Sequence, residues 1–132
     1  MNSLNSLLLE GNLVKDPIER RTPQDSLICN FSIAVNRSYK KEDDYVQEVS
    51  FFDIETWGTL AENCLKHLCK GRGVRVVGRL KQDRWISEDE QPRSRIKVVA
   101  EHIEYKPMIN PNKSQDETSE VEVAKDKVTV AS

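Results

Sequence analysis

Between residues 59 and 85 the chain reads TLAENCLKHLCKGRGVRVVGRLKQDRW, and the spacing of its apolar residues changes within this stretch. Thr59 and Glu62 match a capping box at the start of a helix, and Gly71 is suited to end one. Beyond Gly71 the residues alternate with the period of a strand: Val74, Val76, Gly78 and Leu80 lie on one side, and Arg75, Val77, Arg79, Lys81, Asp83 and Trp85 on the other. The stretch therefore predicts a helix over residues 59–70 and a strand over residues 74–85. The helix would bury an apolar stripe made of Leu60, Ala61, Cys64, Leu65 and Leu68.

Further strand patterns surround this helix. Apolar residues recur at strand spacing in residues 4–14, 28–38 and 45–57 before it, and in residues 93–105 after it. This order predicts an all-β fold, a five-stranded OB-fold Greek-key barrel with one helix between strands 3 and 4. Other small β-barrels stay open as alternatives. We place this domain at residues 1–106 and expect residues 107–132 to form a disordered polar tail, with a short valine-rich strand as the alternative.

The composition argues against several classes of protein. The net charge of −2 argues against a simple polycation. No apolar run reaches the roughly 18 residues of a membrane span, and the N-terminus lacks a signal-peptide pattern, so we expect a soluble cytoplasmic protein. The three cysteines have poor zinc-ligand spacing, which predicts reduced, buried thiols and no metal site.

The sequence offers little for enzymatic chemistry. Its two histidines fall on different elements, and no serine or cysteine has the setting of a catalytic nucleophile. Gly71, Gly73 and Gly78 follow a helix and miss the spacing of phosphate-binding loops. We therefore expect a non-enzymatic protein without a cofactor.

Strand parity divides the aromatic residues into two sets. Phe31 and Phe52 share the parity of neighbouring isoleucines, which predicts that they belong to the core. Phe51 and Trp57 have the opposite parity, and the strand between them carries two acids that would not be buried unpaired. We expect both rings to be exposed or to face a ligand, with a subunit interface as the alternative.

Trp85 closes a basic segment. Residues 66–84 hold seven basic residues, Arg72 among them, and the single acid Asp83. A stacked nucleobase needs a flat ring and a nearby cation for its phosphate, so this segment suits single-stranded nucleic acid, with an ordinary solvated face as the alternative. Tyr39 follows less directly. Regular alternation puts it on the core side, although twist at a strand end could turn it outward.

Several segments, in order along the chain, resemble the bacterial single-stranded DNA-binding protein family. They are LLLEGNLVKDP (7–17), NFSIAV (30–35), WGTLAE (57–62), KG (70–71), VVGRL (76–80) and RW (84–85). The resemblance implies an OB-fold subunit of a homotetramer that binds single-stranded DNA without strong sequence preference. It also implies service in replication, recombination and repair at the nucleoid. It places base-stacking rings at Tyr39, Phe51, Trp57 and Trp85, and basic backbone contacts at Lys70, Lys81 and Arg84.

The sequence also departs from the family pattern. Asp53 stands where a basic residue can occur, and Trp57 where phenylalanine is usual. Members usually end in an acidic tip closing on Pro-Phe that docks replication and repair proteins, whereas this sequence ends in KVTVAS, so we do not expect docking through such a tip. Two other functions stay open: an accessory module that binds mainly another protein, favoured by Asp53 and Glu55, and an RNA-binding OB domain. Outward apolar residues of the first strand favour association with further copies.

Overall fold

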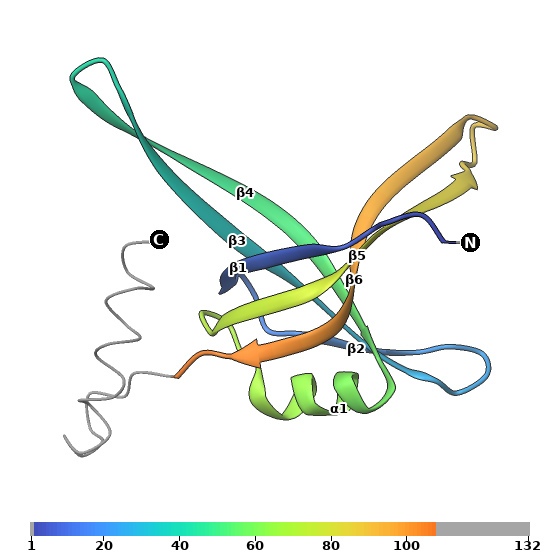
Figure 1. Cartoon of the computed structure of the whole chain (residues 1–132). Coiled ribbons are helices and arrows are strands. Elements are labelled where there is room, and N and C mark those ends of the chain that lie inside the picture. The colour runs from blue at the N-terminus through green and yellow to red at the C-terminus, as the bar shows by residue number, and fades with distance from the viewer. Residues whose placement is uncertain (1, 108–132) are drawn as a thin grey trace.

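The computed structural model describes residues 2–107, in which a helix covers one end of a barrel of strands (Figure 1). The strands are β1 (Leu7–Leu13), β2 (Ile18–Arg21), β3 (Leu27–Lys41), β4 (Asp44–Trp57), β5 (Gly73–Ile86) and β6 (Pro92–Tyr105), and helix α1 (Gly58–His67) joins β4 to β5. The expected disordered tail, apart from Pro107, lies outside the described residues.

The strands close on themselves through a second pairing of β1. Their order in the sheet is β1-β5-β6-β4-β3-β2, and β1 also pairs with β3. Leu13 of β1 pairs with Ile33, and Ile18 of β2 pairs with Asn30, so β1 and β2 act as two parts of one broken barrel strand. The predicted all-β, five-stranded OB-fold barrel with its helix between strands 3 and 4 is confirmed.

Strand β2 was not among the predicted strands. Its four residues, Ile18–Arg21, are all exposed, so they carry no apolar alternation. Backbone pairing with β3 holds this segment in the sheet. A strand whose place depends on a partner far along the chain leaves little signal in its own sequence.

The core lies inside the barrel and against α1. Phe31 and Ile33 of β3 are buried, and Phe52 of β4 is half-buried and packs against the same cluster. Ala61 and Cys64 of α1 are fully buried and close one end of it. Burial of each large apolar side chain stabilises the fold by about 1.5–3 kcal/mol relative to its exposure. The prediction that both phenylalanines belong to the core is confirmed.

The start of α1 differs from the prediction. The helix begins at Gly58 with Trp57 as its N-cap, and no side chain caps it by a hydrogen bond. The capping box predicted for Thr59 and Glu62 is therefore wrong. Gly58 has a φ of 61°, in the left-handed region that favours glycine, and this conformation turns the chain directly from β4 into the helix.

The end of α1 also comes earlier than predicted. The helix ends at His67, where the backbone N–H of Leu68 donates to the carbonyl oxygen of Cys64. Gly71, the predicted stop, has a φ of 90° and lies in the turn before β5.

Among the described residues, a helix with the length and apolar character of a membrane span is absent.

A bulge in β6 changes which residues face the core. Gly78 pairs with Ala100, whereas the residue before Gly78 pairs with His102, so Glu101 is an extra residue in β6. A bulge of this kind reverses the alternation that follows it. Ile103 is buried and His102 is exposed. Val98 and Ala100 are buried before the bulge and Ile103 after it, so regular alternation does not run through the whole of β6.

Two hairpins extend beyond the barrel (Figure 1). Strands β3 and β4 stay paired as far as Lys41 and Asp44, and β5 and β6 as far as Ile86 and Pro92. Leu80 continues the alternation of the buried valines in β5, yet it is 47% exposed. Alternation therefore predicts the side on which a residue lies, but not where the barrel ends.

A side chain at Gly78 would meet the backbone of β6. A Cβ there would lie 2.3 Å from the carbonyl oxygen of Val99. We expect Gly78→Ala to lower the free energy of unfolding by about 1–3 kcal/mol, measured by urea unfolding followed by circular dichroism. Gly73→Ala is the control, because its Cβ meets the flexible side chain of Lys106. Equal stability of the two variants would contradict this packing.

Candidate nucleic-acid interface

The outward side chains of β4 share one surface. Phe51 is 66% exposed and Trp57 is 42% exposed. Their partners on β3 are Ala34 and Ile28, whereas the core residue Phe52 pairs one step along with Ile33. The prediction that Phe51 and Trp57 lie outside the core is confirmed.

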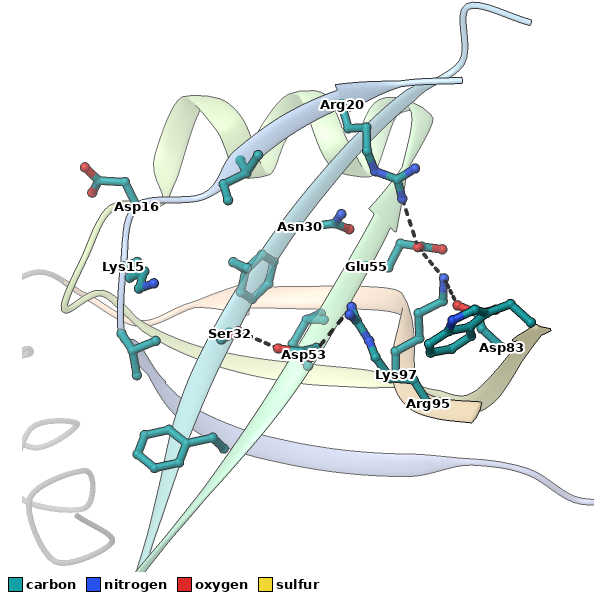
Figure 2. A pocket seen from close by; sticks show the side chains of 16 residues that line it. Lys15, Asp16, Arg20, Asn30, Ser32, Asp53, Glu55, Asp83, Arg95 and Lys97 are labelled. Carbon is teal, nitrogen blue, oxygen red and sulfur yellow. Dashed lines mark hydrogen bonds and ion pairs between the residues drawn. The ribbon is translucent and has the colours of Figure 1, made fainter. Parts of the chain in front are cut away.

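Phe51 and Trp85 line the same groove and come from different hairpins. Phe51 comes from β4, and Trp85, which is 47% exposed, comes from the β5–β6 hairpin. The turn between β1 and β2 also contributes to the groove. Four basic and four acidic side chains line it, so its formal charge is balanced (Figure 2). They are Lys15, Arg20, Arg95 and Lys97, and Asp16, Asp53, Glu55 and Asp83.

Trp57 lies beside a second hollow. Arg79 and Lys81 line this hollow together with Trp57. Glu55 lines both the hollow and the groove, so the two hollows share this residue. The structure thus brings Lys81, one of the predicted phosphate contacts, next to a predicted stacking ring.

Glu55 is held by three donors although it faces outward. Its exposure is 3%. The indole Nε1–H of Trp57 donates to Oε1 at 2.7 Å, and Lys97 Nζ donates to Oε2 at 2.7 Å. The guanidinium of Arg20 lies 3.5 Å from Oε2. Lys97 also pairs with Asp83 at 2.8 Å, so these charges form one connected network (Figure 2).

The network keeps its buried members charged. Burial alone would raise the pKa of Glu55, but hydrogen bonds from Lys97 and Trp57 and the charges of Lys97 and Arg20 outweigh it and lower that pKa. Burial alone would lower the pKa of Lys97, but Asp83 and Glu55 raise it. Glu55 and Lys97 are therefore both ionised at neutral pH.

Asp53, the other acid between Phe51 and Trp57, also has partners within the chain. The hydroxyl of Ser32 donates to Oδ1 at 2.6 Å. The guanidinium of Arg95 lies 3.8 Å from Oδ2 (Figure 2). Both acids that the sequence places between Phe51 and Trp57 are thus matched within the protein.

The structure places Tyr39 apart from the other three rings. It lies on the β3–β4 hairpin opposite Val46 and, by alternation, on the other side of that hairpin from Phe51. The ring is 37% exposed because this part of the hairpin extends past the barrel. The guanidinium of Arg37 lies 5.4 Å from the ring centroid. Strand alternation correctly predicts the side of β3 on which Tyr39 lies, but the core does not cover that side at this point of the hairpin.

Arg84 and Lys70 lie at different places on the surface. Arg84 lies on the opposite side of β5 from Trp85, and its guanidinium donates to Oε1 of Gln82. Lys70 is exposed in the turn after α1, where its backbone N–H donates to Oδ1 of Asp16 at 2.8 Å. Because Asp16 lines the groove, Lys70 lies near one rim of it.

Arg72 is engaged at the end of the barrel. Its Nε–H donates to the carbonyl oxygen of Lys106 at 2.8 Å. Its guanidinium also lies 5.9 Å from the centroid of the Tyr105 ring. Arg72 is absent from the residues that line the groove and from those that line the Trp57 hollow.

Sequence reasoning missed all four basic residues of the groove. Arg95 and Lys97 recur with Arg93 at every second position of the last strand, and that spacing indicates a basic face. Arg20 lies on β2, which carries no strand pattern, and Lys15 lies in the turn between β1 and β2. None of the four belongs to the denser basic run before Trp85.

Residues 4–106 match the model of the Single-strand binding protein family. The chain belongs to this family. The single-stranded DNA-binding protein of Treponema pallidum is 39% identical over 104 residues, which is 79% of this chain and 58% of that protein. Single-stranded DNA-binding protein 2 of Chlorobaculum tepidum is 33% identical over 124 residues, or 92% of this chain and 84% of that protein. The chain thus spans less than two thirds of the Treponema relative.

A solved structure shares the fold. The Plasmodium falciparum SSB, in a complex with ssDNA, matches with a TM-score of 0.73. The match covers 80% of this chain and 97% of that chain, at 20% sequence identity. At this identity the likeness concerns the fold.

The ion pairs of Glu55 make stability depend on pH in the acidic range. Because the pKa of Glu55 is lowered from its ordinary value of 4.5, the ionised carboxylate stabilises the fold above that value. This contribution is lost as pH falls through the lowered pKa. We expect the free energy of unfolding to decrease below pH 4.5, and to decrease less steeply in Glu55→Gln, measured by urea unfolding at several pH values.

The control for this measurement is Glu62→Gln, which changes an exposed glutamate of α1. It should keep the wild-type pH dependence. If the free energy of unfolding of Glu55→Gln decreased with pH as steeply as that of wild type, the ion pairs of Glu55 would not account for the loss of stability in acid.

Proposed function

We propose that the chain binds single-stranded DNA without strong sequence preference, by stacking nucleobases on exposed rings and contacting phosphates with basic side chains. The observation that carries this proposal is the exposure of Phe51, Trp57 and Trp85 on the outward side of β4 and β5. Every nucleobase offers a π-face, so stacking tolerates sequence. The relatives named single-stranded DNA-binding proteins and the related fold in a complex with ssDNA support this ligand.

The proposed cellular role follows from the ligand. The chain would protect and organise single-stranded DNA during replication, recombination and repair. It would do so as a non-enzymatic protein without a cofactor, in the cytoplasm at the nucleoid. Replication and repair proteins are its proposed partners there.

The balanced charge of the groove favours stacking as the main source of affinity. Four basic residues face four acids there, and the ion pairs of Glu55 and Asp53 occupy several of them. Each phosphate contact adds to the salt dependence of binding, so we expect a modest salt slope. Stacking contributes about 1–3 kcal/mol per nucleobase, and several rings can therefore hold a strand with few phosphate contacts.

The other residues predicted to contact DNA differ in how a bound strand could reach them. Lys81 lies beside Trp57 and needs no rearrangement to meet a phosphate. Tyr39 and Arg84 lie on the other sides of their hairpins, so a strand must wrap around a hairpin to reach them. Lys70 can extend the path at the Asp16 rim. Arg72 would first have to release the Lys106 carbonyl.

The charge network also bears on the accessory-module alternative. That alternative depends on Asp53 and Glu55 as acids offered to another protein. Glu55 is buried, and both acids have basic partners within the chain. Glu55 therefore presents little free negative charge and Asp53 already has a basic neighbour, so DNA is the ligand that the face suits better.

We also propose that four copies of the chain assemble. In the described residues, β1 pairs with β3 through Asn12 and Leu13, while its earlier residues pair with β5. Leu8 is 62% exposed on this strand. A strand edge with an apolar side chain promotes association unless it is covered, and further copies would cover it.

Oligo-dT should quench the tryptophan emission, because Trp57 and Trp85 would stack on its bases. Trp85→Ala should weaken binding by about 1–3 kcal/mol, measured by fluorescence titration at two salt concentrations. Ile86→Ala is the matched control, since it changes the next residue on the opposite side of β5 and should bind like wild type. Absence of quenching and of binding at low salt would contradict the proposal. Tighter binding of oligo-U would assign the ligand to RNA.

Light scattering at micromolar concentration should give four times the mass of one chain. Leu8→Glu should lower that mass, because a charge on an exposed strand edge opposes its pairing with another copy. Circular dichroism of Leu8→Glu checks that the barrel is intact. A monomer mass for the wild-type chain would contradict the tetramer.

A further inference from the structure

Glu55 and Trp57 form an unusual pair, a buried carboxylate bonded to an exposed ring. The carboxylate is 3% exposed, whereas the indole is 42% exposed. Their hydrogen bond joins Nε1 of the indole to Oε1 at 2.7 Å. The part of Trp57 that reaches into the protein is thus bonded, while the rest of the ring stays accessible to a ligand.

The carboxylate cannot turn freely away from the ring. Its other oxygen, Oε2, accepts from Lys97 at 2.7 Å and from Arg20 at 3.5 Å. Lys97 is itself held by Asp83. An ionised carboxylate is an acceptor in every orientation, and the lowered pKa of Glu55 keeps it ionised at neutral pH. Oε1 is therefore a fixed acceptor for the indole.

We propose that Glu55 is a positioning residue that fixes the Trp57 ring in the orientation in which it stacks on a nucleobase; this inference rests on the proposed function. A free indole on a strand end would lose side-chain freedom when a base stacks on it. Ordering a mobile side chain opposes binding, and a ring that is already fixed avoids this loss. Glu55 thus acts on DNA through Trp57, although as an acid it would otherwise repel phosphate.

A comparison of the two tryptophans in the wild-type protein tests whether the Trp57 ring is fixed before DNA binds. Trp85 is 47% exposed, which is similar to the 42% exposure of Trp57. Among the described residues, no acceptor is bonded to the indole of Trp85. The Nε1–H of Trp57 should therefore exchange with solvent more slowly than that of Trp85, measured by NMR and assigned by the signal lost in Trp57→Phe. Equal exchange rates would overturn the proposal without any change at Glu55.

A double-mutant cycle tests the effect on binding. Glu55→Met removes the acceptor and also a negative charge, whereas Trp57→Phe keeps a stacking ring without the donor. Glu55→Met removes the same charge from the wild-type chain and from Trp57→Phe. The ratio of its effects on oligo-dT affinity in these two chains therefore measures the coupling between Glu55 and the indole of Trp57. We expect Glu55→Met to be about three- to tenfold more damaging with Trp57 than with phenylalanine at that position.

Glu101→Gln is the matched control for this cycle. Glu101 lines the same hollow as Trp57 and pairs with Arg79, but it belongs neither to the hydrogen bond of the indole nor to the ion pairs of Glu55. Its effect on oligo-dT affinity should be the same with Trp57 or phenylalanine, and the Trp57 indole signal should keep its slow exchange. A ratio of one for Glu55→Met, with normal oligo-dT binding by wild type, would overturn the positioning role alone. Failure of wild type to bind oligo-dT would overturn the proposed function and this inference together.

Discussion

The barrel depends on the parallel pairing of β4 with β6, and this seam places the aromatic rings on one surface. Glu55 of β4 pairs there with Val99 of β6. Without the seam, the β3–β4 and β5–β6 hairpins would be joined only through β1, and Phe51 and Trp85 would not be held along one groove. Lys97 crosses the same seam to reach the Glu55 carboxylate. The joint between the two hairpins is therefore also the centre of the proposed interface.

The ion pair of Glu55 and Lys97 at this seam limits the charge that the face can offer to DNA. Removing one partner of a buried ion pair destabilises a protein by about 3–5 kcal/mol, because the other charge is left unmatched. Lys97 is thus committed to Glu55 and Asp83, and it has little charge left to offer to phosphate. The face combines exposed rings with internally matched charges. Such a surface favours ligands that stack, and it discriminates weakly among polyanions.

Alternation along single strands was enough to predict much of this arrangement. It separates Phe51 from the core correctly, because the side of a strand is a local property. It fails at His102 and Ile103, because the bulge before them depends on how β6 meets β5. The network of Glu55 and Lys97 lay beyond sequence reasoning for the same reason. These residues are 42 positions apart, and only the register between strands brings them to 2.7 Å.

If single-stranded DNA stacks on the outward rings of this face, photoreactive nucleobases should react with those rings. Photo-crosslinking of the full chain to an oligo-dT that carries 5-iododeoxyuridine measures this contact, with the adducts located by mass spectrometry. We expect adducts at Phe51, Trp57 and Trp85. Adducts confined to the opposite side of the β5–β6 hairpin, where Leu80 and Ile96 are exposed, would contradict stacking on these rings.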